Sequence, residues 1–106
     1  MSEAIERARQ IAKKVIAGEY DPLLACRELA MMQEQLSILP DDVMTGFRGI
    51  DSEVDGWPLG PERAYWDKES LREKDVVTAK YREQVREGIE EDLRTLLEAT
   101  RDHNDC

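Results

Sequence analysis

Apolar residues recur every three or four positions along most of this chain, and that spacing is the strongest constraint on its fold. Residues 4–16 place alanine, isoleucine and valine at such steps, and residues 77–97 place valine, isoleucine, leucine and one tyrosine there. This spacing puts the apolar side chains on one face of an α-helix, whereas a half-buried strand needs strict alternation. No segment alternates in that way. The sequence therefore predicts an all-α fold, a small bundle of about four or five helices.

Start and stop residues divide the first third of the chain into two helices. We expect the first over residues 2–18, with Ser2 as its N-cap and Gly18 as its terminator. An Asp-Pro pair at positions 21 and 22 predicts the start of a second helix, over residues 22–37. The short connection between them is typical of an antiparallel helical hairpin. The apolar residues expected to fill the core include Cys26, Met31, Met32 and Met44.

A third helix is expected after Pro40, with Asp41 or Asp42 as its N-cap. Its apolar stripe recurs at steps of four, three and four, at Val43, Phe47, Ile50 and Val54. Gly46 and Gly49 lie inside this stretch, and each glycine destabilises a helix interior by about 0.5–1 kcal/mol relative to alanine. The sequence therefore predicts a short or irregular helix; in the alternative interpretation, the glycines permit the close approach of another helix.

A run rich in glycine and proline over residues 56–61 forms an irregular central connection. We expect Pro61 to open a single helical turn and Asp67 to cap another short turn. Asp75 then predicts the N-cap of a last helix, over residues 76–100. The apolar stripe of that helix is Val77, Tyr81, Val85, Ile89, Leu93, Leu96 and Leu97.

The length of 106 residues corresponds to a single helical domain, which we expect over residues 1–100, with a polar, disordered tail at 101–106. The longest apolar runs have four residues or fewer, whereas a membrane span needs about 20. Charged residues break up the apolar residues of positions 1–18, which therefore lack the continuous apolar segment of a secretory signal. The sequence thus predicts no secretory signal. Cys26 and Cys106 do not make a disulfide framework, and a cytoplasmic protein is expected.

The charge balance is acidic and uneven. The chain has 24 acidic and 15 basic residues, for a net charge of −9. Such a surface repels the phosphate backbone of nucleic acid and speeds association with basic proteins. Residues 41–75 alone carry 10 acids and 5 bases. That middle segment is therefore the expected docking surface for a basic partner, although acidic charge also serves solubility.

Patterns for catalysis and cofactor binding are missing from the sequence. The single histidine, His103, lies in the polar tail, where nothing is expected to hold it in place. This excludes nucleophilic triads that use histidine and a zinc site of cysteine and histidine ligands. The glycines match neither the P-loop nor the dinucleotide-binding pattern. We expect no catalytic residue, no metal, no cofactor and no enzymatic activity.

The acidic and aromatic segment after Pro40 is the best candidate site. In one interpretation its acids dock a cationic partner beside exposed aromatic rings, which often dominate interfaces. In a second interpretation, Asp51 or Glu53 is half-buried and forms an ion pair with Arg48 or Arg63. That pair fixes the position of the loop over residues 56–66, and the tryptophans fill gaps between helices. The candidate binding residues are Asp41, Asp42, Asp51, Glu53, Asp55, Trp57, Arg63 and Trp66.

The stretch from Phe47 to Asp75 is the least generic part of the chain. It reads Phe-Arg-Gly-Ile-Asp-Ser-Glu-Val-Asp over 47–55 and Trp-Pro-Leu-Gly over 57–60, followed by Arg63, Trp66, Leu71 and Lys74-Asp75. Upstream stand Gly-Glu-Tyr-Asp-Pro at 18–22 and Ala-Cys-Arg at 25–27. The chain resembles a group of small bacterial proteins of unknown function that share an Ile-Asp-Ser-Glu-x-Asp…Pro-x-Gly…Arg…Trp core. The resemblance implies a bacterial origin and a domain held together by residues 47–75, and it brings no catalytic residue.

Three functions follow as hypotheses. The leading one is a non-enzymatic protein that docks a basic protein, in its sharpest form a bacterial toxin. Immunity proteins of the colicin type are similar in size, acidity and helical content, but their Tyr-Tyr-Pro inhibitory motif is missing here. The second is a domain that self-associates, as a homo-oligomer, through an apolar helix face, with residues 47–66 holding the fold together. The third is a hydrolase whose metal is held by Asp51, Glu53 and Asp55, although the calcium-loop spacing is absent.

Overall fold

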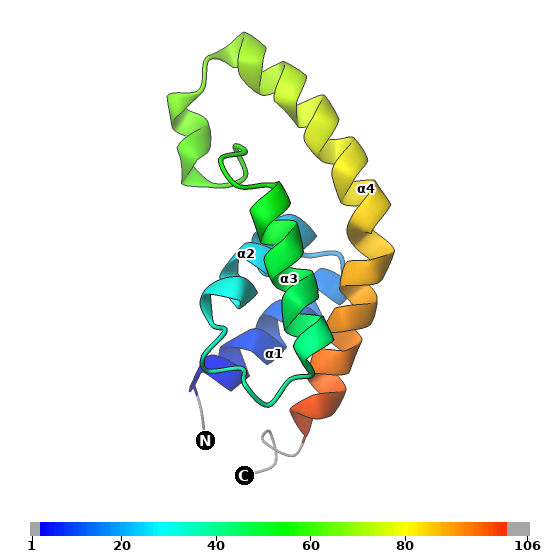
Figure 1. Ribbon diagram of the computed structural model, residues 1–106. Helices are drawn as coiled ribbons and strands as arrows, with labels where there is room; N and C mark the ends of the chain where they lie inside the picture. Colours follow the sequence, from blue (N-terminus) through cyan, green and yellow to red (C-terminus); the bar gives the residue numbers. More distant parts are fainter. Residues whose placement is uncertain (1–2, 102–106) are drawn as a thin grey trace.

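The computed structural model describes residues 3–101, and this part of the chain is all-helical, without a strand. Four α-helices and one short 3-10 helix follow one another along the chain (Figure 1). This arrangement confirms the all-α prediction. The elements are α1 Glu3–Ile16, α2 Pro22–Met31, α3 Asp41–Glu53, the 3-10 helix η1 Pro61–Tyr65, and α4 Lys68–Ala99.

The core lies where α1, α2 and α3 pack against the C-terminal half of α4 (Figure 1). Burying each large apolar side chain there contributes about 1.5–3 kcal/mol. The N-terminal part of α4, residues 68–80, extends beyond the other α-helices, and we call it the arm. The molecule is therefore elongated, measuring 49 × 24 × 23 Å. The largest fully buried apolar side chains are those of Phe47, Leu23, Leu29, Leu36, Leu93 and Leu96.

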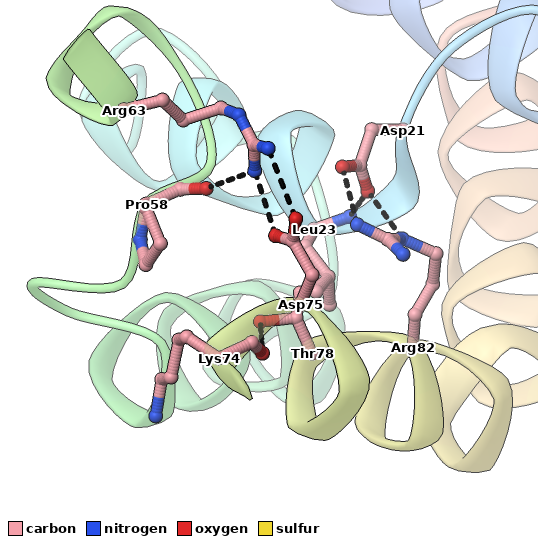
Figure 2. Close-up of polar contacts among 8 residues, drawn as sticks. All are labelled: Asp21, Leu23, Pro58, Arg63, Lys74, Asp75, Thr78 and Arg82. Carbon is pink, nitrogen blue, oxygen red and sulfur yellow. Dashed lines mark hydrogen bonds and ion pairs between the residues drawn. The ribbon is translucent and has the colours of Figure 1, made fainter. Parts of the chain in front are cut away.

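Asp21 joins the start of α2 to α4. Its carboxylate accepts a hydrogen bond from the N–H of Leu23 at 2.9 Å, which confirms the predicted Asp-Pro helix start. The same carboxylate accepts two hydrogen bonds from the Arg82 guanidinium, at 3.1 and 2.9 Å (Figure 2). Before it, α1 ends at Ile16 and the chain turns at Gly18, whose φ of +78° favours glycine.

The second helix is shorter than predicted, because it ends at Met31 and not at residue 37. Residues 32–38 form successive turns, with N–H groups bonded to carbonyls three residues back at 3.0–3.3 Å. These turns bury both Leu36 and Leu39 and reverse the chain toward α3. A straight helix would carry the chain away from α3, so tertiary packing overrides the helical spacing here.

Three of the four expected core fillers are at least partly buried. Cys26 and Met44 lie in the core, and Met32 packs partly against it. Burial raises the pKa of the Cys26 thiol to about 12, so the thiol stays protonated and unreactive at neutral pH. Met31 is 79% exposed at the end of α2, and its assignment to the core is wrong.

The third helix, α3, is a regular helix of 13 residues despite its two glycines. Its N-cap is Pro40, and no side chain caps it, so the predicted capping by Asp41 or Asp42 is wrong. Both acids lie inside the first turn instead, where the helix dipole favours negative charge. The predicted stripe is buried at Val43, Phe47 and Val54 and partly buried at Ile50, and this burial outweighs the cost of the glycines.

The last helix, α4, begins at Lys68 and not at residue 76. Asp67 is its N-cap and accepts hydrogen bonds from the N–H and the hydroxyl of Ser70, at 2.7 and 3.0 Å. These bonds lower the pKa of Asp67. Asp75, the predicted cap, lies two turns inside the helix, so that prediction is wrong.

The predicted apolar stripe of α4 is buried only where other helices cover it. Ile89, Leu93 and Leu96 lie in the core, whereas Val77 is 48% exposed on the arm. The helices of the described part include none long and apolar enough to cross a membrane. Ser2, His103 and Cys106, with the predicted tail beyond residue 101, lie outside the described residues.

Candidate functional site

The structure separates the predicted acidic residues into two groups. Asp41 and Asp42 begin α3, while Glu53 ends it and Asp55 follows. At a rise of about 1.5 Å per residue, α3 places the two groups roughly 16 Å apart. All four side chains are exposed, and none forms an ion pair with a base among residues 3–101. Asp51 differs from them, because it is half-buried and faces α2.

Asp51 and η1 share one arginine of α2. The Nη1 of Arg27 donates to Glu62 Oε1 at 2.6 Å, and its Nε lies 4.0 Å from Asp51 Oδ1. The hydrogen bond from Arg27 lowers the pKa of Glu62 to about 2. The predicted pairing of Asp51 with Arg48 or Arg63 is therefore wrong, because α3 presents Asp51 to α2.

Arg63 of η1 pairs with Asp75 of the arm. Its two terminal nitrogens donate to the two carboxylate oxygens of Asp75 at 2.8 and 3.1 Å (Figure 2). Nη1 also donates to the carbonyl of Pro58 at 3.0 Å. The hydrogen bonds lower the pKa of Asp75 and raise that of Arg63. This candidate binding residue thus connects the central loop to α4.

Trp57 packs against α4 rather than pointing into solvent. Its ring meets that of Tyr81 edge-on, with ring centroids 5.5 Å apart and an interplanar angle of 70°. The Nζ of Lys74 lies 3.8 Å from the centroid of the Trp57 ring. Trp57 is half-buried, so it fills the gap between the central loop and α4. Trp66 is also half-buried, whereas Tyr65 is 90% exposed.

The start of α3 lies beside the C-terminal half of α4 (Figure 1), and there the negative charges of Asp42 and Glu91 act on Asp92. The carboxylate of Asp92 lies against Gly46, where an added Cβ would be 2.6 Å from Asp92 Oδ2. Desolvation raises the pKa of Asp92, and the negative charges of Asp42 and Glu91 raise it further. No basic side chain among residues 3–101 pairs with these acids. We call Asp42, Glu91 and Asp92 the acidic cluster.

The sequence prediction included Asp42 but missed Glu91 and Asp92. A signal was present, because Asp92 stands seven residues after Val85 and four before Leu96, in step with the apolar stripe. A carboxylate at such a position lies beside the core, where water solvates it less. The close approach predicted for the glycines of α3 is confirmed at Gly46, where the side chain of Asp92 lies, and is wrong at Gly49, where nothing lies within 4 Å of an added Cβ.

The described residues provide fixed negative charge rather than a metal centre. Among residues 3–101, no group of three or more histidine, cysteine, aspartate or glutamate side chains could hold a metal ion. A hollow of about 540 Å³ lies between α2 and α3, lined by Met31, Arg48 and Asp51 among others. Its one carboxylate already faces Arg27. The acidic cluster is therefore the more promising binding feature.

Comparisons with protein-family models, with curated proteins and with solved structures found no match for this chain.

Proposed function

We propose that this chain is a non-enzymatic binding protein whose acidic cluster docks a basic surface of another protein. One observation carries the proposal: Asp92 lies against Gly46, partly desolvated and under the negative charges of Asp42 and Glu91, and no base among residues 3–101 pairs with these acids. Like charges that the fold holds together repel one another, and a lysine or arginine from a partner relieves that repulsion. The cluster is thus complementary to a cation before any partner arrives.

The surrounding surface supports the same partner chemistry. Glu53 and Asp55 lie exposed at the other end of α3, roughly 16 Å from the cluster at about 1.5 Å per residue. A standard interface buries about 800 Å² on each partner, which is wide enough to include both groups. The net charge of −9 also attracts a basic protein over longer range.

The test compares three baits in a lysate of the native host at low salt. The first is the wild type, and the second combines Asp42→Asn, Glu91→Gln and Asp92→Asn. The third is a control with the same change of net charge, made of Glu19→Gln, Glu34→Gln and Glu87→Gln, all at exposed positions.

We expect one basic protein to bind the wild type and the control and to elute with rising salt. Its affinity for the cluster variant should be at least about tenfold lower, because charge pairs at an interface contribute this much or more. Equal affinity for all three baits, or binding that salt does not weaken, would contradict the proposed function.

A further inference from the structure

The arm presents an exposed face with a regular pattern. Glu73, Val76, Val77 and Lys80 follow at steps of three, one and three, so they lie on one side of α4. Val76 and Val77 are 55% and 48% exposed. The helices α1, α2 and α3 pack against the other half of α4 (Figure 1). Within residues 3–101 this apolar pair therefore remains largely uncovered.

A hollow of about 310 Å³ lies next to Val77. Its other lining residues are Trp66, Ser70, Glu73 and Lys74. An aliphatic side chain from a second molecule would remove the faces of Trp66 and Val77 from water there, which favours association. The hollow thus extends the valine pair into a surface that an apolar helix face can fit.

We propose that this surface binds the arm of a second copy of the chain, antiparallel, about a two-fold axis between Val76 and Val77. That axis places Glu73 opposite Lys80 of the second copy and Lys80 opposite its Glu73. Both side chains are exposed, and neither forms an ion pair among residues 3–101. The pattern is therefore self-complementary, with two ion pairs flanking four valines.

Charge also favours a second copy at this surface. Residues 68–80 carry four bases and three acids, whereas the whole chain has a net charge of −9. Two copies can therefore meet at their arms without the repulsion that opposes contact between their other surfaces. A parallel pairing would instead set Glu73 beside Glu73 and Lys80 beside Lys80, which like-charge repulsion disfavours.

Analytical ultracentrifugation over a range of micromolar concentrations tests the dimer, which has twice the 12.2 kDa mass of one chain. Glu73→Lys and Lys80→Glu should each raise the dimer Kd about tenfold, because the two-fold axis doubles each charge clash. The double variant reverses both charges, and its Kd should return to within about threefold of the wild-type value. Residues 73 and 80 of one helix are about 10 Å apart, so a contact within one chain would not give this rescue.

The matched control is Glu34→Lys, an exposed position after α2 and outside the arm, and it should leave the Kd unchanged. Val77→Arg should abolish the dimer. Because Val77 is exposed, the variant protein should still unfold cooperatively in a thermal melt. A wild type that is monomeric at every concentration would overturn the proposal, as would a double variant without rescue or an equal effect of Glu34→Lys. The acidic-cluster variant should still dimerise, so this proposal and the proposed function can fail separately.

Discussion

The guanidinium of Arg63 and the carboxylate of Asp75 meet side by side, with hydrogen bonds of 2.8 and 3.1 Å between η1 and the arm. Because Arg63 also donates to the carbonyl of Pro58, one side chain connects the 3-10 helix, the central loop and α4. Contacts that share one side chain support one another, since each fixes the geometry that the others need. Arg63 therefore orders the connection that returns the chain from α3 to the arm.

We predict that Arg63→Ala lowers the Tm at neutral pH by more than Arg72→Ala, an exposed arginine on the arm. Arg63 lowers the pKa of Asp75, so its stabilising effect is present above the ordinary pKa of an aspartate. That effect is lost as the pH falls through the lowered pKa of the folded state. Thermal melts at neutral and strongly acidic pH check this, and equal Tm losses for the two variants at neutral pH would contradict it.

Asp92→Asn should raise the Tm at neutral pH. The pKa of Asp92 is raised by desolvation and by its acidic neighbours, so ionisation of this carboxylate destabilises the folded state. That destabilisation is absent below the ordinary pKa of 3.8 and grows as the pH rises through the raised value. The gain from Asp92→Asn should therefore vanish at strongly acidic pH. Melts of the wild type, this variant and Glu87→Gln over a pH series would show it, and a gain independent of pH would count against the desolvated cluster.

The two glycines of α3 should respond differently to alanine. Gly49→Ala meets no atom within 4 Å and should stabilise the protein by about 0.5–1 kcal/mol, the helix-propensity gain. Gly46→Ala should gain less, because its Cβ would lie 2.6 Å from Asp92 Oδ2. Denaturant unfolding measures both free energies. Combining Gly46→Ala with Asp92→Ala should recover the missing gain, whereas equal gains for the two single variants would refute the contact.

Arg9 is buried at 8% exposure and binds the C-terminal end of α4. Its Nη1 donates to the carbonyl of Leu97 at 2.8 Å and to the hydroxyl of Thr100 at 2.7 Å. Arg9→Met keeps most of the buried stem but loses both bonds, and it should cost about 1.5–3 kcal/mol of unfolding free energy. Lys13→Met, at an exposed position of α1, is the control. Similar losses for the two variants in urea denaturation would show that these bonds contribute little.

Local sequence was sufficient to predict the helical class, the start of α2 and the apolar stripe of α3. It could not choose between Asp67 and Asp75 as the cap of the last helix, because both precede good helix-forming residues. In the structure Asp67 caps α4 through Ser70, three residues later, while the side chain of Asp75 binds Arg63. The end of α2 could not be predicted from local sequence either, because it depends on the burial of Leu36 and Leu39 in the core.

The candidate site was predictable only in part for the same reason. Asp42 and Arg63 were predicted as binding residues from the acidic, aromatic segment. In the structure Asp42 belongs to the acidic cluster and Arg63 pairs with Asp75. Their neighbours come from other helices, as in the pairing of Arg27 with Glu62, which are 35 residues apart in the chain. Periodicity places a residue on a face of its own helix, but it does not identify which residue of another helix lies opposite.

The charge along α4 is uneven from one end of the helix to the other. Residues 68–82 carry five bases and three acids, and residues 83–101 carry three bases and six acids. The peptide dipoles of the helix add to this separation, because they are positive at Lys68 and negative at Ala99. A basic protein that approaches α4 would therefore be attracted most strongly to its C-terminal half, where Glu91 and Asp92 lie. Added salt would slow its association more than it would change its dissociation.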